Sequence, residues 1–438
     1  MRSTARLPTA SVAVVDRFRL CRYRTPFRVG LYSSGIVPDG PGTLAEGNLK
    51  RALQPVGAAL SLGVIFVAVL SVPLDAASQL ELSSTETAGW IMAVYGVPSL
   101  LSLVLIWRYR QPLVVTGNVF ILIFVLLLGA ELGWTELVGA TMLAGAIVLV
   151  LGLTGLTDRL ASLLPAPIVF GLLAGTVLPF VAGMFTELGQ ATLIVGSTLA
   201  AYFLARAALG RRIPAILPAL LVGAVVAGAD GAMGPIPTLA WPVPSMTLPE
   251  LTLRAVLSAT PVMVVLITLQ ANAPSVVFLR NQDYEPPERM VAVMSGIGTT
   301  LGSIFGPMGV SLSLPATALV AGPDAGERGI RHWAAYVAAG IGVIIALLSG
   351  FAAEFRAVIP PALLAAAVGL AVIGILSEAI QQIGRGPLLL GPMLAFTVSL
   401  SELQLFGLGR FFWALAIGIA GSLLLEREQW RSLRVNAT

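Results

Sequence analysis

The stretch of residues 305–322 lies where a membrane-spanning helix is expected, yet its first half does not suit a helix. Gly306, Pro307 and Gly309, together with the serine alternation at 311–313, favour extended backbone. Only from Leu314 does the sequence favour a helix, which covers about 12 Å at 1.5 Å per residue. Since the hydrocarbon core of a bilayer is about 30 Å thick, we predict a strand that enters from one side and a half-helix that begins near the midplane.

A half-helix that begins inside the membrane constrains function as well as fold. Irregular backbone at this depth is tolerated only where it is buried in protein or lines a cavity. The N-terminus of such a helix carries unpaired N–H groups and the positive end of the helix dipole, which together attract anions. Secondary transporters built from inverted repeats bind their substrates in this way. The pattern therefore predicts a second broken segment in the other half of the chain.

The composition assigns the chain to the polytopic membrane proteins. Hydrophobic residues make up 57% of the 438 residues and charged residues only 11%, with a mean hydropathy of +0.91, a balance that soluble domains do not tolerate. A single cysteine, Cys21, excludes an internal disulfide, and a single histidine, His332, excludes paired-histidine metal sites. We expect no metal, no cofactor and no enzymatic activity, because no nucleophile–base pair or metal constellation is present. We also expect no nucleic acid partner, because no soluble basic face is visible.

Successive apolar runs divide the chain into fourteen predicted spans, arranged as seven plus seven around a Pro-rich connection at residues 230–250. The spans of the first half lie at 52–74, 87–107, 112–130, 136–156, 163–184, 190–208 and 213–229. The spans of the second half lie at 251–279, 289–305, 306–322, 331–353, 358–381, 387–402 and 408–425. We therefore predict an all-α polytopic membrane protein in which the third segment of each half combines a short strand with a half-helix.

The placement of arginine predicts the orientation in the membrane. With the N-terminus in the cytoplasm, 23 of the 26 basic residues fall on the cytoplasmic side, and only Arg254, Arg356 and Arg410 fall outside. This asymmetry follows the positive-inside rule. It predicts a multi-pass protein of the plasma (inner) membrane with both termini in the cytoplasm. An odd number of spans per half makes the two halves inverted relative to each other.

Residues 1–51 are predicted to be a basic cytoplasmic tail. Residues 1–50 carry seven arginines and Lys50, the only lysine of the chain, and no apolar run long enough for a signal peptide. Three interpretations stay open: a mobile tail, a start codon placed too far upstream of the native protein, and a polybasic segment on anionic lipid headgroups. At the other end, residues 427–438 are predicted to be a cytoplasmic tail.

The second broken segment is found at residues 112–130. Pro112 and the β-branched residues after it favour extended backbone. Asn118 or Thr116 is then a suitable N-cap for a helix that runs on to residue 130. Six extended residues (~20 Å) and a helix of about 18 Å suffice to cross the bilayer. The two half-helices would enter from opposite sides, with their N-termini facing each other across a small gap.

Two amide side chains lie near the centre of the span 251–279. Gln270 and Asn272 are costly in hydrocarbon unless they are hydrogen-bonded, and Pro274 is expected to loosen the backbone after them. They either hold neighbouring helices together or line the substrate cavity beside the N-terminal ends of the two half-helices, which we call their tips. No Asp or Glu lies at the centre of any predicted span, so the sequence shows no buried acid that could carry a coupled proton.

A series of short motifs characterises both halves of the chain. Those of the second half are Gln270-Ala-Asn-Ala-Pro274, Val277-Phe-Leu-Arg280, Tyr284-Glu-Pro286, Phe305-Gly306 and Gly322-Pro-Asp-Ala325. Those of the first half run from Ser84 to Trp90 and from Trp107 to Pro112. In this order they resemble the landmarks of the bacterial benzoate/proton symporter (BenE) family. The resemblance covers most of residues 52–426 and nothing before them.

The resemblance implies the inverted-repeat fold shared with nucleobase and sulfate permeases. In that fold a core domain, here residues 52–156 and 251–353, carries the substrate and moves against a gate domain, here residues 157–229 and 354–426. Such carriers often work as homodimers, here through the gate domain. The family substrate is an aromatic carboxylate cotransported with protons, which suits facing half-helix tips and an apolar wall such as Phe120.

The candidate substrate site therefore combines the two half-helix tips with the central amides of the span 251–279. The tips would hold a carboxylate with backbone N–H groups around residues 118–120 and 313–316, and the amides would add hydrogen bonds. The predicted site residues are Gly117, Asn118, Val119, Phe120, Gln270, Asn272, Ser311, Ser313 and Leu314.

The sequence departs from the family at two places that would touch the ligand. Ala271 separates Gln270 from Asn272, whereas the family has the two amides adjacent, and the first tip reads Thr-Gly-Asn-Val-Phe where the family favours a Trp-Ser/Thr-Pro-Gly-like run. The expected function is a proton-coupled secondary transporter of a small organic anion, benzoate or a similar aromatic carboxylate. The alternatives are a permease of the same fold for a nucleobase or an inorganic anion, and a passive anion channel.

Overall fold

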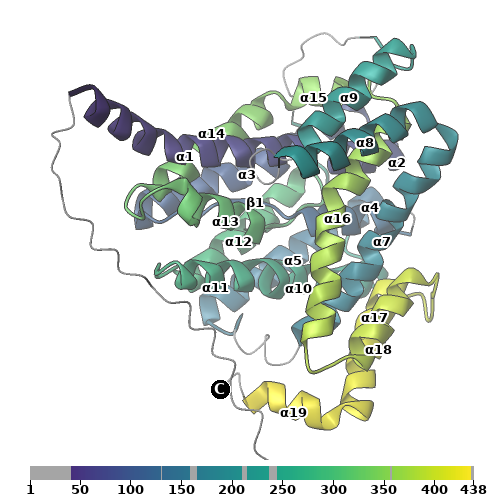
Figure 1. Ribbon diagram of the computed structural model, residues 1–438. Helices are drawn as coiled ribbons and strands as arrows, with labels where there is room; N and C mark the ends of the chain where they lie inside the picture. The colour runs from purple at the N-terminus through teal and green to yellow at the C-terminus, as the bar shows by residue number, and fades with distance from the viewer. Residues whose placement is uncertain are drawn as a thin grey trace, which may run out of the picture. The chain divides into compact units, whose positions relative to one another are not determined.

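The computed structural model describes residues 41–129, 131–157, 165–209, 215–235, 244–355 and 358–435. Regular structure within these ranges is helical except for two short strands (Figure 1). The elements of the first half are α1 (Pro41–Val69), α2 (Ser71–Gln79), α3 (Ser84–Tyr109), β1 (Val115–Gly117), α4 (Val119–Leu128), α5 (Trp134–Thr154), α7 (Ala166–Gln190), α8 (Thr192–Leu209) and α9 (Ile216–Ala229). Those of the second half are α10 (Leu253–Val265), a π-helix (Leu266–Asn272), α11 (Ala273–Asn281), α12 (Glu288–Gly302), a 3-10 turn (Ser303–Phe305), β2 (Val310–Leu312), α13 (Leu314–Ala321), a second 3-10 turn (Pro323–Ala325), α14 (Arg331–Leu347), α15 (Ser349–Phe355), α16 (Pro361–Arg385), α17 (Leu390–Leu400), α18 (Arg410–Leu425) and α19 (Arg427–Val435).

These elements coincide with the predicted spans. Each span that the apolar runs predict contains a helix, consecutive helices, or a strand followed by a helix. Within the described ranges, six helical stretches are long and apolar enough to cross a membrane by themselves, and the remaining apolar helices are shorter. The total of fourteen crossings therefore stays a prediction.

Both ends of the described chain form helices within segments predicted as tails, which the apolar runs did not indicate. α1 begins at Pro41, inside the segment predicted as a tail, and the helix α19 lies where a C-terminal tail was predicted. The spans were placed from apolar runs, whereas helix formation also depends on propensity, and residues 44–50 contain Leu, Ala, Glu and Lys, all of them helix formers. Pro41 suits the first turn of a helix. The basic segment before Pro41, with its three interpretations, lies outside the described residues.

The helix α3 begins and ends where the local sequence dictates. Ser83 caps its start, because the hydroxyl accepts from the Glu86 N–H while the Glu86 carboxylate accepts from the Ser83 N–H. Arg110 ends the helix in a left-handed conformation (φ +52°), with its N–H donated to the Ile106 carbonyl. Pro112 then prevents a further turn and starts the extended segment that leads into β1.

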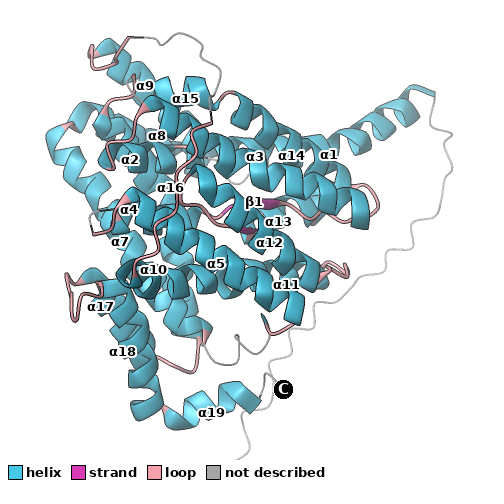
Figure 2. Ribbon diagram, turned by 180° about the vertical axis from the view of Figure 1, so that it is seen from behind, coloured by secondary structure: helices cyan, strands magenta, loops and turns pink. Residues whose placement is uncertain are grey.

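The strands β1 and β2 form an antiparallel pair that joins the two halves of the chain (Figure 2). Val115 lies opposite Leu312, Thr116 opposite Ser311, and Gly117 opposite Val310. The half-helices α4 and α13 each begin two residues after a strand ends. Pairing satisfies the N–H and C=O groups of extended backbone, which would otherwise be costly inside a membrane. The sequence predicts the extended segments but not that they pair.

Each strand is also held by a hydroxyl group on the long helix that precedes it. In the first half, the buried Ser102 hydroxyl on α3 accepts from the Val115 N–H (2.9 Å) and donates to the Val115 carbonyl (3.0 Å). In the second half, the buried Thr299 hydroxyl on α12 accepts from the Val310 N–H (2.9 Å). Because α3 and α12 cover the second predicted spans of their halves, the matching contacts are what an inverted repeat requires.

The helices pack in two sets. In one set, α5 packs against α10 and α12, and α3 packs against α14, α15 and β1. In the other set, α7 packs against α16 and α17, α17 packs against α18, and α8 packs against α9. We name them the core set and the gate set after the predicted core and gate domains, and this division into two domains stays a prediction. The sets meet where α10 contacts α18 and where α7 contacts α4 and the π-helix.

One buried acid organises the end of the gate set. Glu426 follows α18, and its carboxylate accepts from the N–H groups of Leu389 (2.6 Å), Leu390 (2.8 Å) and Gly391 (3.0 Å) at the start of α17, and from the Ser422 hydroxyl (2.9 Å). Burial raises the pKa of this carboxyl, but the hydrogen bonds from Gly391, Leu389, Leu390 and Ser422 together outweigh burial and lower the pKa below its usual value of 4.5. The acid therefore supplies the cap that α17 lacks in its own sequence.

We expect Glu426→Gln to lower the melting temperature of the detergent-solubilised protein at pH 7, with a difference from the parent that shrinks as the pH is lowered. A carboxyl whose pKa is lower in the folded state contributes stability that is present above its unfolded pKa, about 4.5, and is lost as the pH falls through the folded pKa. Melting curves between pH 7 and about pH 4 measure this difference. Glu428→Gln, at an exposed position on α19, is the control and should leave the curves unchanged.

Candidate functional site

Asn118 joins the first half-helix to the second half of the chain. As the N-cap of α4, its Oδ1 accepts from the N–H groups of Phe120 (3.0 Å) and Ile121 (3.2 Å). Its Nδ2 donates to the Ser311 hydroxyl on β2 (3.0 Å) and to the Leu266 carbonyl in the π-helix (3.3 Å). The side chain is only 3% exposed. All four of its hydrogen-bonding positions are thus used inside the protein.

The tip of α4 is therefore mostly closed to a ligand. The Asn118 N–H donates to the Gly309 carbonyl (2.7 Å), and the Phe120 N–H donates to the Asn118 side chain. We expected the backbone N–H groups of residues 118–120 to be free to hold a carboxylate. For Asn118 and Phe120 this expectation is wrong, because both N–H groups already have a partner within the protein. The physical reason is that a capping side chain competes with any ligand for the same first-turn N–H groups. The prediction of Asn118 as an N-cap is confirmed.

The tip of α13 is open by comparison. Ser313 lies at the N-cap position in an extended conformation, and among the described residues no side chain caps the helix. The amides of Leu314 and Ala316 belong to the first turn and have no partner within the helix, and Pro315 between them has no N–H and is exposed. Ser313 and Leu314 are half-buried. This end thus offers backbone donors and the positive end of a dipole.

The two central amides have different roles. The Asn272 Oδ1 accepts from the Leu312 N–H on β2 (2.8 Å), and its Nδ2 donates to the Ser295 hydroxyl on α12 (3.1 Å). Asn272 therefore holds the second strand in place. Gln270 is 8% exposed, and its Oε1 is buried with no hydrogen-bond partner among the described residues. Because an unpaired buried amide oxygen is costly, Gln270 requires a hydrogen-bond donor as a further partner, and the buried Thr317 hydroxyl on α13 also has no partner among the described residues.

Both amides lie in a π-helix, Leu266–Asn272, which the sequence does not reveal. We expected Pro274 to loosen the backbone after them, whereas the wide turn comes before the proline. Pro274 has no N–H to donate to the carbonyl four residues earlier, and the Ala273 N–H instead donates to the Thr268 carbonyl five residues back. Wide turns of this kind are frequent at functional sites, because they turn side chains away from the regular helical positions.

Close backbone approaches hold the strands at this junction. A Cβ atom on Gly117 would lie 2.7 Å from a Val94 methyl group and 2.8 Å from the Val94 carbonyl oxygen on α3, so only glycine fits. Gly306 adopts φ +143° against Trp90, whose indole N–H donates to the Pro307 carbonyl (3.0 Å). These contacts fix where each strand enters.

The structure brings Asn118, Ser311 and Asn272 to one junction of β1, β2 and the π-helix. Asn118 contacts Ser311 directly, and Asn272 contacts the strand that ends just before Ser313. Sequence reasoning missed the hydroxyl groups of Ser102, Ser295 and Thr299. A hydroxyl in an apolar helix usually bonds to a carbonyl of its own helix, so the sequence offers no signal that singles these out.

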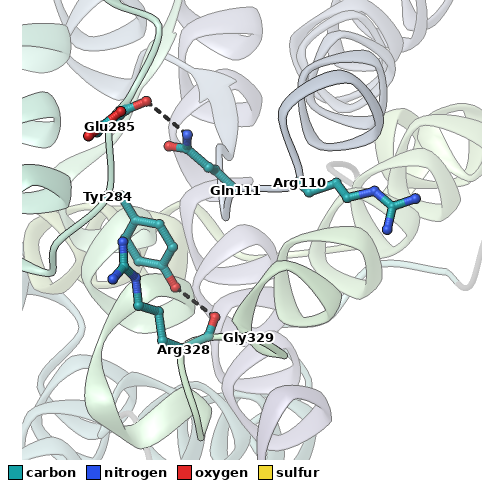
Figure 3. Close-up of a pocket in the computed structure, with 6 residues that line it drawn as sticks. All are labelled: Arg110, Gln111, Tyr284, Glu285, Arg328 and Gly329. Atoms are coloured by element: carbon teal, nitrogen blue, oxygen red, sulfur yellow. Dashed lines mark hydrogen bonds between the residues drawn. The ribbon is translucent and has the colours of Figure 1, made fainter.

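A cavity of about 430 Å³ lies away from this junction (Figure 3). It is lined by Arg110, Gln111, Tyr284, Glu285, Arg328 and Gly329. The Gln111 amide donates to the Glu285 carbonyl (2.8 Å) and the Tyr284 hydroxyl to the Arg328 carbonyl (3.0 Å), while Arg110 points away from the others. All six residues lie on the predicted cytoplasmic side and none is a predicted site residue. This cavity is therefore separate from the candidate substrate site.

The sequence profile of the benzoate membrane transport protein family (BenE) matches residues 54–424. The chain belongs to this family. It is 26% identical over 358 residues to the inner membrane protein YdcO of Escherichia coli, covering 80% of this chain and 90% of the relative. It is 24% identical over 360 residues to the benzoate membrane transport protein of Acinetobacter baylyi, covering 81% and 90%. As a member of the benzoate transporter family, the chain is a membrane transporter and not an enzyme.

Solved structures share the fold of this benzoate transporter family member. The transmembrane domain of the cyanobacterial bicarbonate transporter BicA matches with a TM-score of 0.50 and 14% identity, over 87% of this chain and 98% of that chain. SLC26A9 matches with a TM-score of 0.60 and 13% identity, over 87% and 66%. The murine Slc26a9 anion transporter in the inward-facing state matches with a TM-score of 0.58 and 12% identity, over 85% and 68%. These likenesses confirm the predicted inverted-repeat fold class, and at such identities they concern the fold alone.

Proposed function

We propose that this family member carries benzoate or a similar aromatic carboxylate, together with protons, across the plasma (inner) membrane by alternating access of the core set against the gate set. The observation that supports this most is the uncapped N-terminus of α13, which follows the strand that Asn272 of the π-helix holds in place. The free amides of Leu314 and Ala316 suit a carboxylate, because both donors and the helix dipole favour a negative charge. Asn118, which fills the opposite tip, then serves to position α4 rather than to bind the substrate by its backbone.

The remaining predicted residues would hold the apolar part of the substrate. Val119 and Phe120 are half-buried at the tip of α4, and Gly117 is half-buried beside them. An aromatic ring packs favourably against such a surface. The Gln270 Nε2 can donate to the carboxylate, and its unpaired Oε1 can accept once the carboxylate carries a proton. Ser311 and Asn272 would act indirectly, because their side chains already bind Asn118 and Leu312.

The proton is proposed to join the bound carboxylate inside the site, or to bind transiently elsewhere in the chain. Among the described residues that form the junction, none is an acid or a histidine, so the chain offers no titratable group there. The proposal includes a homodimer that associates through the gate set. In the described ranges no cluster of three metal-binding side chains occurs.

Uptake of labelled benzoate by proteoliposomes under an imposed pH gradient tests the function. We expect uptake above that of empty liposomes, which stops when a protonophore removes the gradient. Absence of uptake would exclude benzoate, and a thermal-shift screen over aromatic acids, nucleobases and inorganic oxyanions would then identify the substrate class. A current that is independent of the proton gradient would instead indicate a passive channel.

We expect Gln270→Leu to raise the KM for uptake about tenfold or more, because a hydrogen bond to a charged ligand contributes about 1.5–3 kcal/mol. Thr268→Val is the matched control in the same π-helix. The Thr268 hydroxyl bonds to the Val264 carbonyl of its own helix (2.7 Å), so its removal should leave KM unchanged. An unaltered KM in Gln270→Leu would place the carboxylate elsewhere.

A further inference from the structure

Each half-helix has an arginine near the end opposite its tip. At α13, the Arg331 guanidinium donates to the Ala321 carbonyl in the last turn (2.7 Å), to the Gly326 carbonyl (2.8 Å) and to the Gln282 Oε1 (3.2 Å). A cation in this place is favourable, because the C-terminal end of a helix dipole is negative. Arg331 begins α14, which packs against α13 and α3 in the core set. This arginine therefore stays with its half-helix in any motion of the core set against the gate set.

At α4 the arginine comes from the other set of helices. Glu131 follows the end of α4, and its Oε1 lies 4.0 Å from the Nε of Arg410, the first residue of α18 in the gate set. The Glu131 side chain is 13% exposed and that of Arg410 is 20% exposed. The Arg410 Nε is buried and has no hydrogen-bond partner among the described residues. The pair is thus held by charge at a loose distance, which makes it easier to break than the three hydrogen bonds of Arg331.

A glycine allows the acid to approach the gate helix. The Glu131 carboxylate lies against Gly409, the N-cap of α18, so closely that a Cβ atom at position 409 would overlap it. The acid therefore lies at the positive end of the α18 dipole as well as beside Arg410. Both interactions draw the end of α4 towards the gate set.

A pair of aromatic rings joins the same two helices. Phe124 on α4 and Phe411 on α18 are fully buried, with ring centroids 4.9 Å apart and an interplanar angle of 68°. Edge-to-face pairs of this kind are favourable beyond the area they bury. The Arg410 guanidinium carbon lies 4.8 Å from the Phe411 ring centroid. The charged pair and the ring pair therefore form one continuous contact.

We infer that Glu131 and Arg410 are positioning residues that hold the outer end of α4 against the gate set and keep the substrate site closed to the outside. The inference rests on the proposed function, since only alternating access requires this contact to break and re-form in each cycle. Arg410 is one of the three basic residues that the charge distribution places outside the membrane. On the cytoplasmic side, the end of α13 is held by Arg331, which belongs to the core set itself. In the described residues, a charged pair between the two sets therefore exists at the end of α4 but not at the end of α13.

A cysteine at position 258 reports whether the outer side is closed. Ser258 on α10 is 2% exposed, and its hydroxyl accepts from the Gly409 N–H (3.4 Å). It therefore lies next to the contact of Glu131 with Gly409 and Arg410. In a Cys21→Ser background, Ser258→Cys is labelled in intact cells with a membrane-impermeant thiol reagent. We expect slow labelling in this parent, and labelling about three- to tenfold faster when Glu131→Gln or Arg410→Gln is added. Arg254→Gln, which removes another outer arginine, should leave the rate unchanged.

A double variant distinguishes a joint role from two separate effects. If the two side chains act as a pair, Glu131→Gln together with Arg410→Gln labels no faster than either single variant. Unchanged labelling in both single variants, in protein that elutes as one species, would overturn the inference, and so would increases that add in the double variant. Labelling needs no substrate, so a failure to transport benzoate would leave this result intact. Normal benzoate uptake with unchanged labelling would overturn only the role of the pair.

Discussion

Replacing Asn118 by alanine is expected to lower the rate of substrate uptake about 100-fold and to lower the melting temperature of the protein. Its side chain makes four hydrogen bonds that link the start of α4 to β2 and to the π-helix. The cap contributes about 0.5–2 kcal/mol, and the change also leaves the buried Ser311 hydroxyl and Leu266 carbonyl without this donor. A tip that shifts by about 1 Å is enough for a loss of this size. Proteoliposome uptake and thermal unfolding in detergent measure the two effects.

Asn118→Ser separates the cap from the link between the two halves. Serine caps a helix about as well as asparagine, but its shorter side chain cannot also reach Ser311 and Leu266. We therefore expect stability to return towards that of the parent while uptake stays low. Full uptake in Asn118→Ser would mean that the link between α4 and β2 is not needed for transport.

Gly117→Ala is expected to abolish uptake or lower it about 100-fold, even if the protein still folds. The added Cβ would lie 2.7 Å from a Val94 methyl group and 2.8 Å from the Val94 carbonyl oxygen. The carbonyl belongs to the backbone of α3 and cannot turn aside, so β1 has to move, at a cost of about 1–3 kcal/mol. Since Gly117 immediately precedes Asn118, the displacement reaches the tip of α4 directly. The initial rate of uptake checks this expectation.

Gly340→Ala is the matched control for that change. Gly340 lies within α14, and a Cβ atom there would meet no atom within 4 Å. Because alanine is favoured over glycine in a helix by about 1 kcal/mol, we expect unchanged uptake and an equal or higher melting temperature. If Gly117→Ala behaved like this control, the strand β1 would have room to shift, and the close approach to α3 would not matter for transport.

The starts of the two half-helices could be predicted from the sequence. A helix near Leu314 and an N-cap at Asn118 or Thr116 were both predicted, and α13 and α4 begin at Leu314 and Val119. These features depend on prolines, glycines and capping side chains within a few residues of the helix start. Local backbone preference is sufficient to decide them, so no knowledge of distant residues is needed.

The contacts that complete the site could not be predicted in this way. Asn118 and Ser311 are 193 positions apart in the chain, and the Asn272 side chain serves a strand 40 residues away. Whether a side-chain amide bonds to a strand or stays free to bind a ligand depends on which groups the fold brings within about 3 Å of it. The sequence left both interpretations open for Gln270 and Asn272. The structure shows that Asn272 holds a strand, while the binding role of Gln270 is a proposal.

By itself, the sequence determined that the chain is a polytopic membrane protein, where its apolar spans lie, and that two of them break into a strand and a half-helix. Apolar run length and the backbone preferences of proline and glycine are local properties, so these conclusions needed no fold. Only the tertiary structure decided which of the two tips stays open. The two tips look alike in the sequence, but in the folded chain Asn118 occupies the first-turn amides of α4 while no side chain in the described residues caps those of α13. Side chains and ligands compete for the same few N–H groups, and the spatial neighbours of each tip determine the outcome.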